Sequence, residues 1–238
     1  MKASFVVIDF ETGGTSLPDQ RTEEILVAND LARICGTYYD PPVQFAAIAY
    51  TKEFVEVESL NILISFDPLL CSAEALEICH YDEELWKKSA IVAPMASVRI
   101  CKFFEKHAIR MQHDKGPFRA ARLMAHNAEF DIAHLRKLCH WKWCDAAFWH
   151  GRDTGYMDTK HLAQWYGIMR GRQFKSLKLE DIYVELFNEP YNAHDALADC
   201  RATARIARVM MFGMRQAWSF ARDVDAYTDG KPAFPGQE

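Results

Sequence analysis

Residues 3–12 read ASFVVIDFET, a short apolar run rich in β-branched and aromatic residues that ends in two carboxylates. Because side chains two apart on a strand share a face, we expect Asp9 and Glu11 side by side at the end of a first strand. Adjacent carboxylates repel each other unless water or a cation screens them, and hard ions such as Mg²⁺ prefer oxygen ligands of this kind. An isolated pair of this kind is more often a strand end where acidic groups simply reach water.

Two more apolar runs follow the first, at residues 43–50 and 54–64. The little chain between them predicts antiparallel pairing of three strands. A fourth run, at residues 120–125, leads directly into a helical pattern, which is typical of a crossover to a parallel strand. Helices are predicted at residues 92–107, 128–138, 159–166, 176–187 and 196–221, with Thr159 and Ser176 as N-caps.

This order of elements predicts an α/β fold: a mixed sheet of three antiparallel strands followed by parallel strands, flanked by helices. We expect a single domain at residues 1–222, with an inserted helical segment near residues 19–36 and a flexible tail at residues 223–238.

A second candidate pair, Asn127 and Asp131, lies in the segment HNAEFD at residues 126–131. If Asn127 caps the helix, Asp131 lies one turn in, on the same side. The helix dipole stabilises a carboxylate there, at the sheet edge where open α/β sheets bind ligands. A capping Asn followed by a dipole-favoured Asp explains this segment as well.

The third candidate group, His194 and Asp199, lies in NAHDALAD at residues 192–199. A histidine can accept a proton from water near neutral pH, although a lone one at a helix start is commonly a cap or a surface group. The conjunction of the three segments carries more weight than any one of them. Four carboxylates from separate elements, with no Lys or Arg inside the motifs, require cations, and two divalent ions commonly serve phosphoryl transfer to water.

The motifs DFET at residues 9–12, HNAEFD at 126–131 and HDALAD at 194–199 resemble those of the DEDDh family of 3′-to-5′ exonucleases. That family includes the proofreading epsilon subunit of bacterial DNA polymerase III, and the resemblance runs over about residues 3–214. It implies an RNase H-like core that releases nucleoside 5′-monophosphates from the 3′ end of single-stranded DNA, in replication or repair.

The resemblance also assigns roles to residues. It implies two divalent ions, Mg²⁺ or Mn²⁺, held by a set of four carboxylates, Asp9, Glu11, Asp131 and Asp199, with Asp9 bridging both ions. His194 would deprotonate the attacking water. Thr12 and Asn127 would position the terminal nucleotide.

Five basic residues and no acidic one lie within residues 160–178. We expect four of them to contact backbone phosphates, namely Arg170, Arg172, Lys175 and Lys178. An ordinary solvated face is the alternative.

Two other functions stay open. The motifs do not test for a 2′-hydroxyl, so an RNA 3′ exonuclease of the same family is the nearest rival. The second alternative is a non-catalytic subunit that binds a DNA polymerase or a sliding clamp. Residues 216–220, QAWSF, loosely resemble a clamp-binding peptide, although we expect them to continue the last helix.

Bulk composition says less about function. The net charge of −5 would argue against nucleic-acid binding, but residues 53–85 carry nine acidic and no basic residues, so we expect an acidic face turned away from the substrate. Seven scattered cysteines and a start too brief for a signal peptide predict reduced thiols, a cytoplasmic location and no membrane association.

Overall fold

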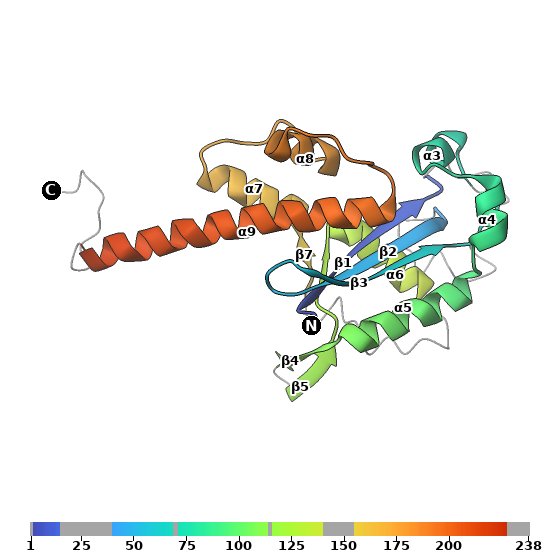
Figure 1. The fold of residues 1–238 in the computed structure, drawn as a ribbon, viewed down its shortest axis with the longest axis horizontal. Helices are drawn as coiled ribbons and strands as arrows, with labels where there is room; N and C mark the ends of the chain where they lie inside the picture. The colour runs from blue at the N-terminus through green and yellow to red at the C-terminus, as the bar shows by residue number, and fades with distance from the viewer. Residues whose placement is uncertain (1, 15–39, 69–70, 114–115, 140–154, 228–238) are drawn as a thin grey trace.

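The computed structural model describes residues 2–14, 40–68, 71–113, 116–139 and 155–227 (Figure 1). Its centre is a five-stranded sheet in the order β3-β2-β1-β6-β7. The strands are β1 (Phe5–Thr12), β2 (Pro42–Tyr50), β3 (Glu56–Leu63), β6 (Leu123–Ala125) and β7 (Met157–Asp158). The first three pair antiparallel, whereas β6 pairs parallel with β1 and β7 parallel with β6. The predicted mixed α/β sheet is therefore confirmed.

Helices cover both faces of this sheet. Helices α5 (Ala93–His107) and α6 (Ala128–Leu138) pack on one face, and the long helix α9 (Ala196–Tyr227) crosses the other (Figure 1). Helices α7 (Thr159–Met169) and α8 (Leu179–Phe187) pack on the outer side of α9. Strand β2 is buried along its whole length because it lies inside the sheet with both faces covered.

Two short helices and a hairpin complete the described elements. Helices α3 (Ala73–Ile78) and α4 (Glu83–Ser89) lie at the carboxyl end of β1, and the hairpin β4 (Ile109–His113) and β5 (Gly116–Ala120) forms a separate two-stranded sheet. The apolar run at residues 120–125, predicted as one strand, is split: Ala120 ends β5 and Leu123 begins β6. The hairpin was missed because β5 begins with Gly and Pro, which strands disfavour.

Both N-caps predicted from hydroxyl residues are wrong. Helix α7 is capped by Asp158, whose carboxylate accepts from the N–H of Lys160, and Thr159 is buried within the helix. Helix α8 has Lys178 at its N-cap position without a side-chain hydrogen bond, while Ser176 Oγ accepts from the Lys178 N–H just outside the helix.

Helix α9 runs to Tyr227, beyond the predicted end at residue 221. It includes residues 216–220, so the expectation that this segment continues the last helix is confirmed. The proposed insertion at residues 19–36 lies outside the described residues, and the domain boundaries stay predictions.

Cys71, Cys79, Cys139 and Cys200 are free in the structure, whereas Cys101 forms a disulfide, contrary to the expectation of reduced thiols. None of the helices in the described part of the chain is both long and apolar enough to span a bilayer.

Candidate active site

Strand alternation decides which face of the sheet carries the first two carboxylates. Val6, Ile8 and Phe10 belong to the apolar cluster formed with α5 and α6. The intervening residue Val7 packs with α9 instead. Because Asp9 and Glu11 continue the register of Val7, both carboxylates face the α9 side of the sheet, at the carboxyl end of β1.

Asp131 reaches β1 across the edge that the short strand β6 leaves open. Pairing between β1 and β6 stops at Val7 and Met124, so the sheet offers no β6 partner to the later residues of β1. Asp131 Oδ1 accepts a hydrogen bond from the Phe10 N–H at 3.0 Å, and only 2% of Asp131 is exposed. The hydrogen bond fixes this carboxylate beside the strand that carries Asp9 and Glu11.

The start of α6 is held by a residue from β7. Asp158 accepts from the N–H groups of Asn127 and Ala128 through its two carboxylate oxygens, at 3.1 and 3.0 Å. Asn127 has a left-handed backbone, with φ of 63°, and its side chain makes no capping hydrogen bond, contrary to the sequence-based expectation. The Asn127 Oδ1 accepts from Lys160 Nζ at 3.3 Å instead, and both residues line a cavity beside the site.

His194 and Asp199 meet at the start of α9. His194 also has a left-handed backbone, with φ of 65°, and its N–H donates to Asp199 Oδ2 at 3.3 Å. The left-handed region is costly for residues other than glycine and, when observed, often marks a functional site. Asp195 caps α9, since its Oδ1 accepts from the Ala198 N–H at 2.9 Å.

These elements gather four carboxylates, Asp9, Glu11, Asp131 and Asp199, here called the acid cluster. Burial raises the pKa of Asp9, and the charges of Asp131 and Glu11 raise it further. Burial together with the nearby Asp199 and Asp195 raises the pKa of Glu11 to about 8. Within the described residues no ion pair with Lys or Arg neutralises the cluster. Such a cluster needs either protons or cations.

The donors in the acid cluster suit a hard divalent ion. Ligand atoms of Glu11, His194 and Asp199 all lie within 4.8 Å of one another. The Oδ1 atom of Asp199 is buried and accepts no hydrogen bond from the described residues, although buried polar atoms are normally paired. Carboxylate oxygens are the ligands that Mg²⁺ and Mn²⁺ prefer, so the residues present fit such ions.

A cavity of about 510 Å³ opens beside the acid cluster and is here called the site cavity. It brings together His194 and Asp199 with Asn127, and Lys178 also lines it. Arg172 pairs with Glu185 at 3.1 Å, Arg170 lies over the Tyr166 ring, and neither lines this cavity. The phosphate contacts predicted for Arg170, Arg172, Lys175 and Lys178 stay predictions, as does the positioning of the terminal nucleotide by Thr12 and Asn127.

Three polar residues beside the acid cluster escaped the sequence analysis. Asp195 directly follows His194 and contributes a fifth carboxylate near Glu11. Gln44 pairs with Glu11 in the β1–β2 register and donates to Asp195 Oδ2 at 3.4 Å. Tyr191 lines the site cavity. Period-2 alternation on β2 could have placed Gln44 on the α9 face, but only once the register with β1 is known.

His126, in the second motif, ties the site to the chain before α8. Its Nε2 lies 2.8 Å from the carbonyl oxygen of Leu177, which can only accept, so Nε2 carries the proton. Its Nδ1 lies 2.9 Å from Thr159 Oγ1. Burial lowers the pKa of His126, which favours a neutral ring.

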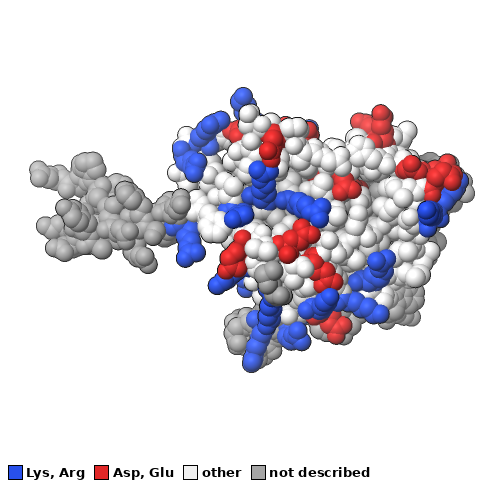
Figure 2. Space-filling model, in the orientation of Figure 1, with Lys and Arg blue, Asp and Glu red and all other residues white. Residues whose placement is uncertain are grey.

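The acidic segment at residues 53–85 does not lie wholly away from the site, contrary to expectation. The Ser72 N–H donates to the Gly13 carbonyl at 2.8 Å, which brings α3 against the end of β1. A Cβ at Gly13 would lie 2.2 Å from Cys71 Sγ, so only glycine permits this approach. Figure 2 shows acidic side chains over α3 and α4. A second cavity, of about 640 Å³, lies between these helices and His194, and the residues of this segment that line it include the uncharged Cys79 and Leu85 and also His80.

The fold and site define an α/β protein with a four-carboxylate cluster and a histidine at the carboxyl end of its first strand. Solved structures with this fold include those of exonuclease I. The E. coli enzyme in complex with a dA16 oligonucleotide aligns with a TM-score of 0.64 and 20% identity over 92% of this chain and 43% of that chain.

Two further structures of the E. coli enzyme align over the same shares, 92% of this chain and 43% of that chain, at 19% identity. The complex with dT13 has a TM-score of 0.63, and the zinc-bound complex with single-stranded DNA has one of 0.62. This chain thus spans less than half the length of these neighbours. No protein-family model matches the chain, and no curated protein matches it.

Proposed function

We propose that this protein is a metal-dependent 3′-to-5′ exonuclease of the DEDDh type that releases nucleoside 5′-monophosphates from single-stranded DNA. The observation that carries the proposal is the convergence of Asp9, Glu11, Asp131 and Asp199 with His194 in one partly buried site. The shared fold with exonuclease I, solved in complexes with oligonucleotides, supports the substrate class.

In this proposal the acid cluster would hold two divalent ions, Mg²⁺ or Mn²⁺. When bound, such ions stabilise negative charge on the phosphate and on the leaving 3′-oxygen. The raised pKa values of Asp9 and Glu11 support this role, because a cation would compensate for the burial and the repulsion that together raise them.

His194 takes the proton in the proposed reaction. It is exposed at the mouth of the site cavity, and its backbone N–H is held by Asp199, so its ring is placed beside the acid cluster yet open to water. An imidazole can accept the proton of a water molecule that attacks the phosphate. Asn127 and Lys178, which also line the site cavity, would bind the terminal nucleotide and its phosphate.

Matched DNA and RNA oligomers test the proposal directly. The protein is incubated with each 5′-labelled single strand and Mg²⁺ or Mn²⁺, and the products are separated by length and by nucleotide. We expect a ladder that shortens from the 3′ end and releases 5′-monophosphates faster from DNA. Faster digestion of RNA than of DNA would show that RNA is the preferred substrate. If neither strand is digested, the exonuclease proposal fails and a non-catalytic binding subunit is favoured.

Replacing His194 by Gln tests the proton acceptor. We expect the rate of nucleotide release to fall by about 10²–10⁴-fold at neutral pH, because general base catalysis typically contributes that much. The Mn²⁺ concentration at half-maximal rate should change far less. The measurement is the rate between pH 6 and 9 for both proteins; a profile unchanged by the substitution would remove His194 from this role.

A further inference from the structure

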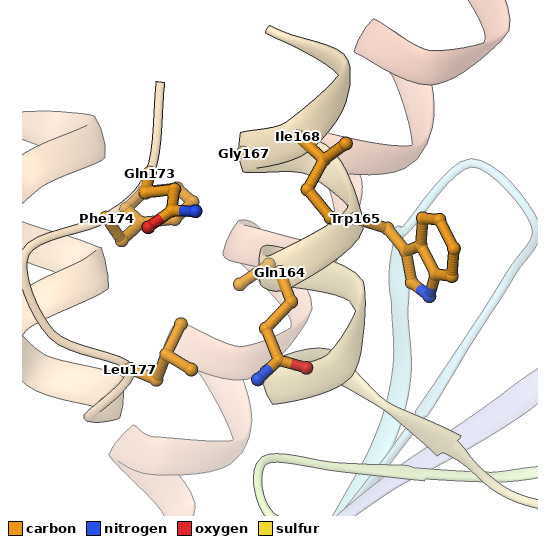
Figure 3. Close-up of a pocket in the computed structure, with 8 residues that line it drawn as sticks. Gln164, Trp165, Gly167, Ile168, Gln173, Phe174 and Leu177 are labelled. Carbon is orange, nitrogen blue, oxygen red and sulfur yellow. The ribbon is translucent and has the colours of Figure 1, made fainter. Parts of the chain in front are cut away.

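We propose that a pocket between α7 and residues 170–178, here called the α7 pocket, binds an unstacked base of the substrate strand upstream of the 3′ nucleotide. The inference rests on the proposed function, since it assumes a single-stranded substrate in the site cavity. The α7 pocket has a volume of about 420 Å³ and contains none of the acid cluster (Figure 3).

The α7 pocket is preformed, because three contacts fix residues 170–178, here called the basic loop. The Arg172 N–H donates to the Gly167 carbonyl at 3.0 Å, and a Cβ at Gly167 would lie 3.0 Å from the Arg172 carbonyl oxygen. The Phe174 ring stacks beside Tyr166 at 6.4 Å between centroids. At the far end, the Leu177 carbonyl is bound by His126.

The lining of the α7 pocket is uncharged and combines apolar surface with amides. Figure 3 shows Gln164 on the α7 side and Gln173, Phe174 and Leu177 on the loop side, whereas the Trp165 ring projects away. Ile168 also lines the pocket and is 61% exposed. A nucleobase has an apolar face for stacking and an edge of donors and acceptors that an amide can match.

The charges around the α7 pocket complement a phosphodiester backbone. Four cations belong to the basic loop, which forms one wall of this uncharged pocket: Arg170, Arg172, Lys175 and Lys178. Within the described residues, Arg172 is the one member of this group that forms a side-chain ion pair, and its partner is Glu185. Figure 2 shows basic side chains gathered in this part of the surface. Cations beside an uncharged, partly aromatic pocket are the arrangement that single-stranded nucleic acid favours.

The α7 pocket adjoins the site cavity at Leu177. Leu177 lines both, and Lys178, the next residue, lines the site cavity together with His194 and Asp199. A strand with its 3′ end at the acid cluster can therefore pass over Leu177 and place an upstream base against Ile168 and Gln173. We therefore assign the α7 pocket to a base of the substrate strand itself.

Ile168→Glu places a negative charge at the pocket without disturbing buried atoms, and Gln173→Leu removes the amide while keeping its approximate size. Met95→Glu, on the exposed side of α5 across the sheet, adds the same charge as a control. Each protein is assayed with Mn²⁺ on a single-stranded DNA oligomer and on the p-nitrophenyl ester of thymidine 5′-monophosphate, which is too short to reach the pocket.

We expect Ile168→Glu to raise the KM for the oligomer by about tenfold, with a smaller rise for Gln173→Leu, and to leave the ester unchanged. Met95→Glu should match the parent protein on both substrates. One abasic position upstream of the 3′ nucleotide should raise the KM of the parent protein but not that of Ile168→Glu. An unchanged oligomer KM, or an equal rise with the ester, would overturn the pocket assignment while leaving the exonuclease intact.

Equilibrium binding separates this inference from the proposed function. Fluorescence anisotropy with a labelled single-stranded oligomer measures affinity even if the parent protein cleaves neither substrate. Weaker binding by Ile168→Glu than by Met95→Glu supports the pocket, and equal affinity of the two variants overturns it.

Discussion

Asp9→Asn should reduce nucleotide release by about a thousandfold or more while leaving a folded protein. The substitution removes the carboxylate at the centre of the acid cluster, and loss of one group that stabilises transition-state charge commonly costs 10²–10³-fold. It also removes the cost of burying this charge and the repulsion from Asp131 and Glu11, so we expect the free energy of unfolding in chelator to rise. The measurements are a nuclease assay with Mn²⁺ and thermal unfolding with EDTA.

Glu74→Gln provides a control of equal charge change for Asp9→Asn. Glu74 is exposed on α3, so this variant should retain the parent rate and stability. Turnover by Asp9→Asn at the parent rate would refute the assignment of the acid cluster. A stability loss in Asp9→Asn would show instead that the carboxylate is paired in the metal-free protein.

In the absence of metal, Glu11→Gln should be more stable than the parent protein, and the difference in stability should grow as pH rises. The pKa of Glu11 is raised from 4.5 to about 8 in the fold, so the folded state holds this proton more tightly than the unfolded state does. The corresponding stability is complete below pH 4.5 and is lost as pH rises through about 8. Glutamine does not titrate and escapes this loss.

Each pKa unit corresponds to about 1.4 kcal/mol, and Glu11 is partly exposed, so solvent screening leaves a net effect of about 2 kcal/mol. For a chain of this length, that is a Tm difference of about 4–8 °C between pH 5 and pH 8. The comparison is made between variant and parent because burial of neutral His126 acts in the opposite sense below about pH 6.5 and cancels in the difference.

Metal should reverse the order of the two proteins. Mn²⁺ or Mg²⁺ binds the folded parent through Glu11 and stabilises it by mass action, whereas Glu11→Gln lacks that ligand. Thermal unfolding at pH 8 with chelator and with added Mn²⁺ measures both effects. Parallel curves for the two proteins at every pH, unaffected by metal, would contradict a metal site at Glu11.

Much of the fold could be predicted because local patterns and burial agree. Strand β2 is buried throughout and β1 over most of its apolar residues, and α6 has the predicted bounds at residues 128–138. The N-caps of the helices could not be predicted in this way. Thr159 and Ser176 have suitable side chains, but Asp158, which is adjacent to Thr159 in sequence, forms the stronger charge-assisted hydrogen bonds to the starts of both α6 and α7.

In the candidate site, too, some features could be predicted from the sequence and others could not. The three motifs, with their spacing of carboxylates and one histidine, predict the acid cluster, because alternation on β1 and helix periodicity are properties of the local chain. The partners between elements depend on register and packing. Gln44 meets Asp195 only because β2 aligns it with Glu11, and Leu177 meets His126 across 51 positions of sequence.

The sequence by itself therefore determines a mixed α/β sheet and the identity of the acidic residues, since strand and helix periods place side chains without long-range information. Tertiary structure alone decides how those acids are charged and what surrounds them. Burial and mutual repulsion raise the pKa values of Asp9 and Glu11, and these effects depend on distances through space. The α7 pocket has the same origin, because its walls meet only where the basic loop folds back on Gly167.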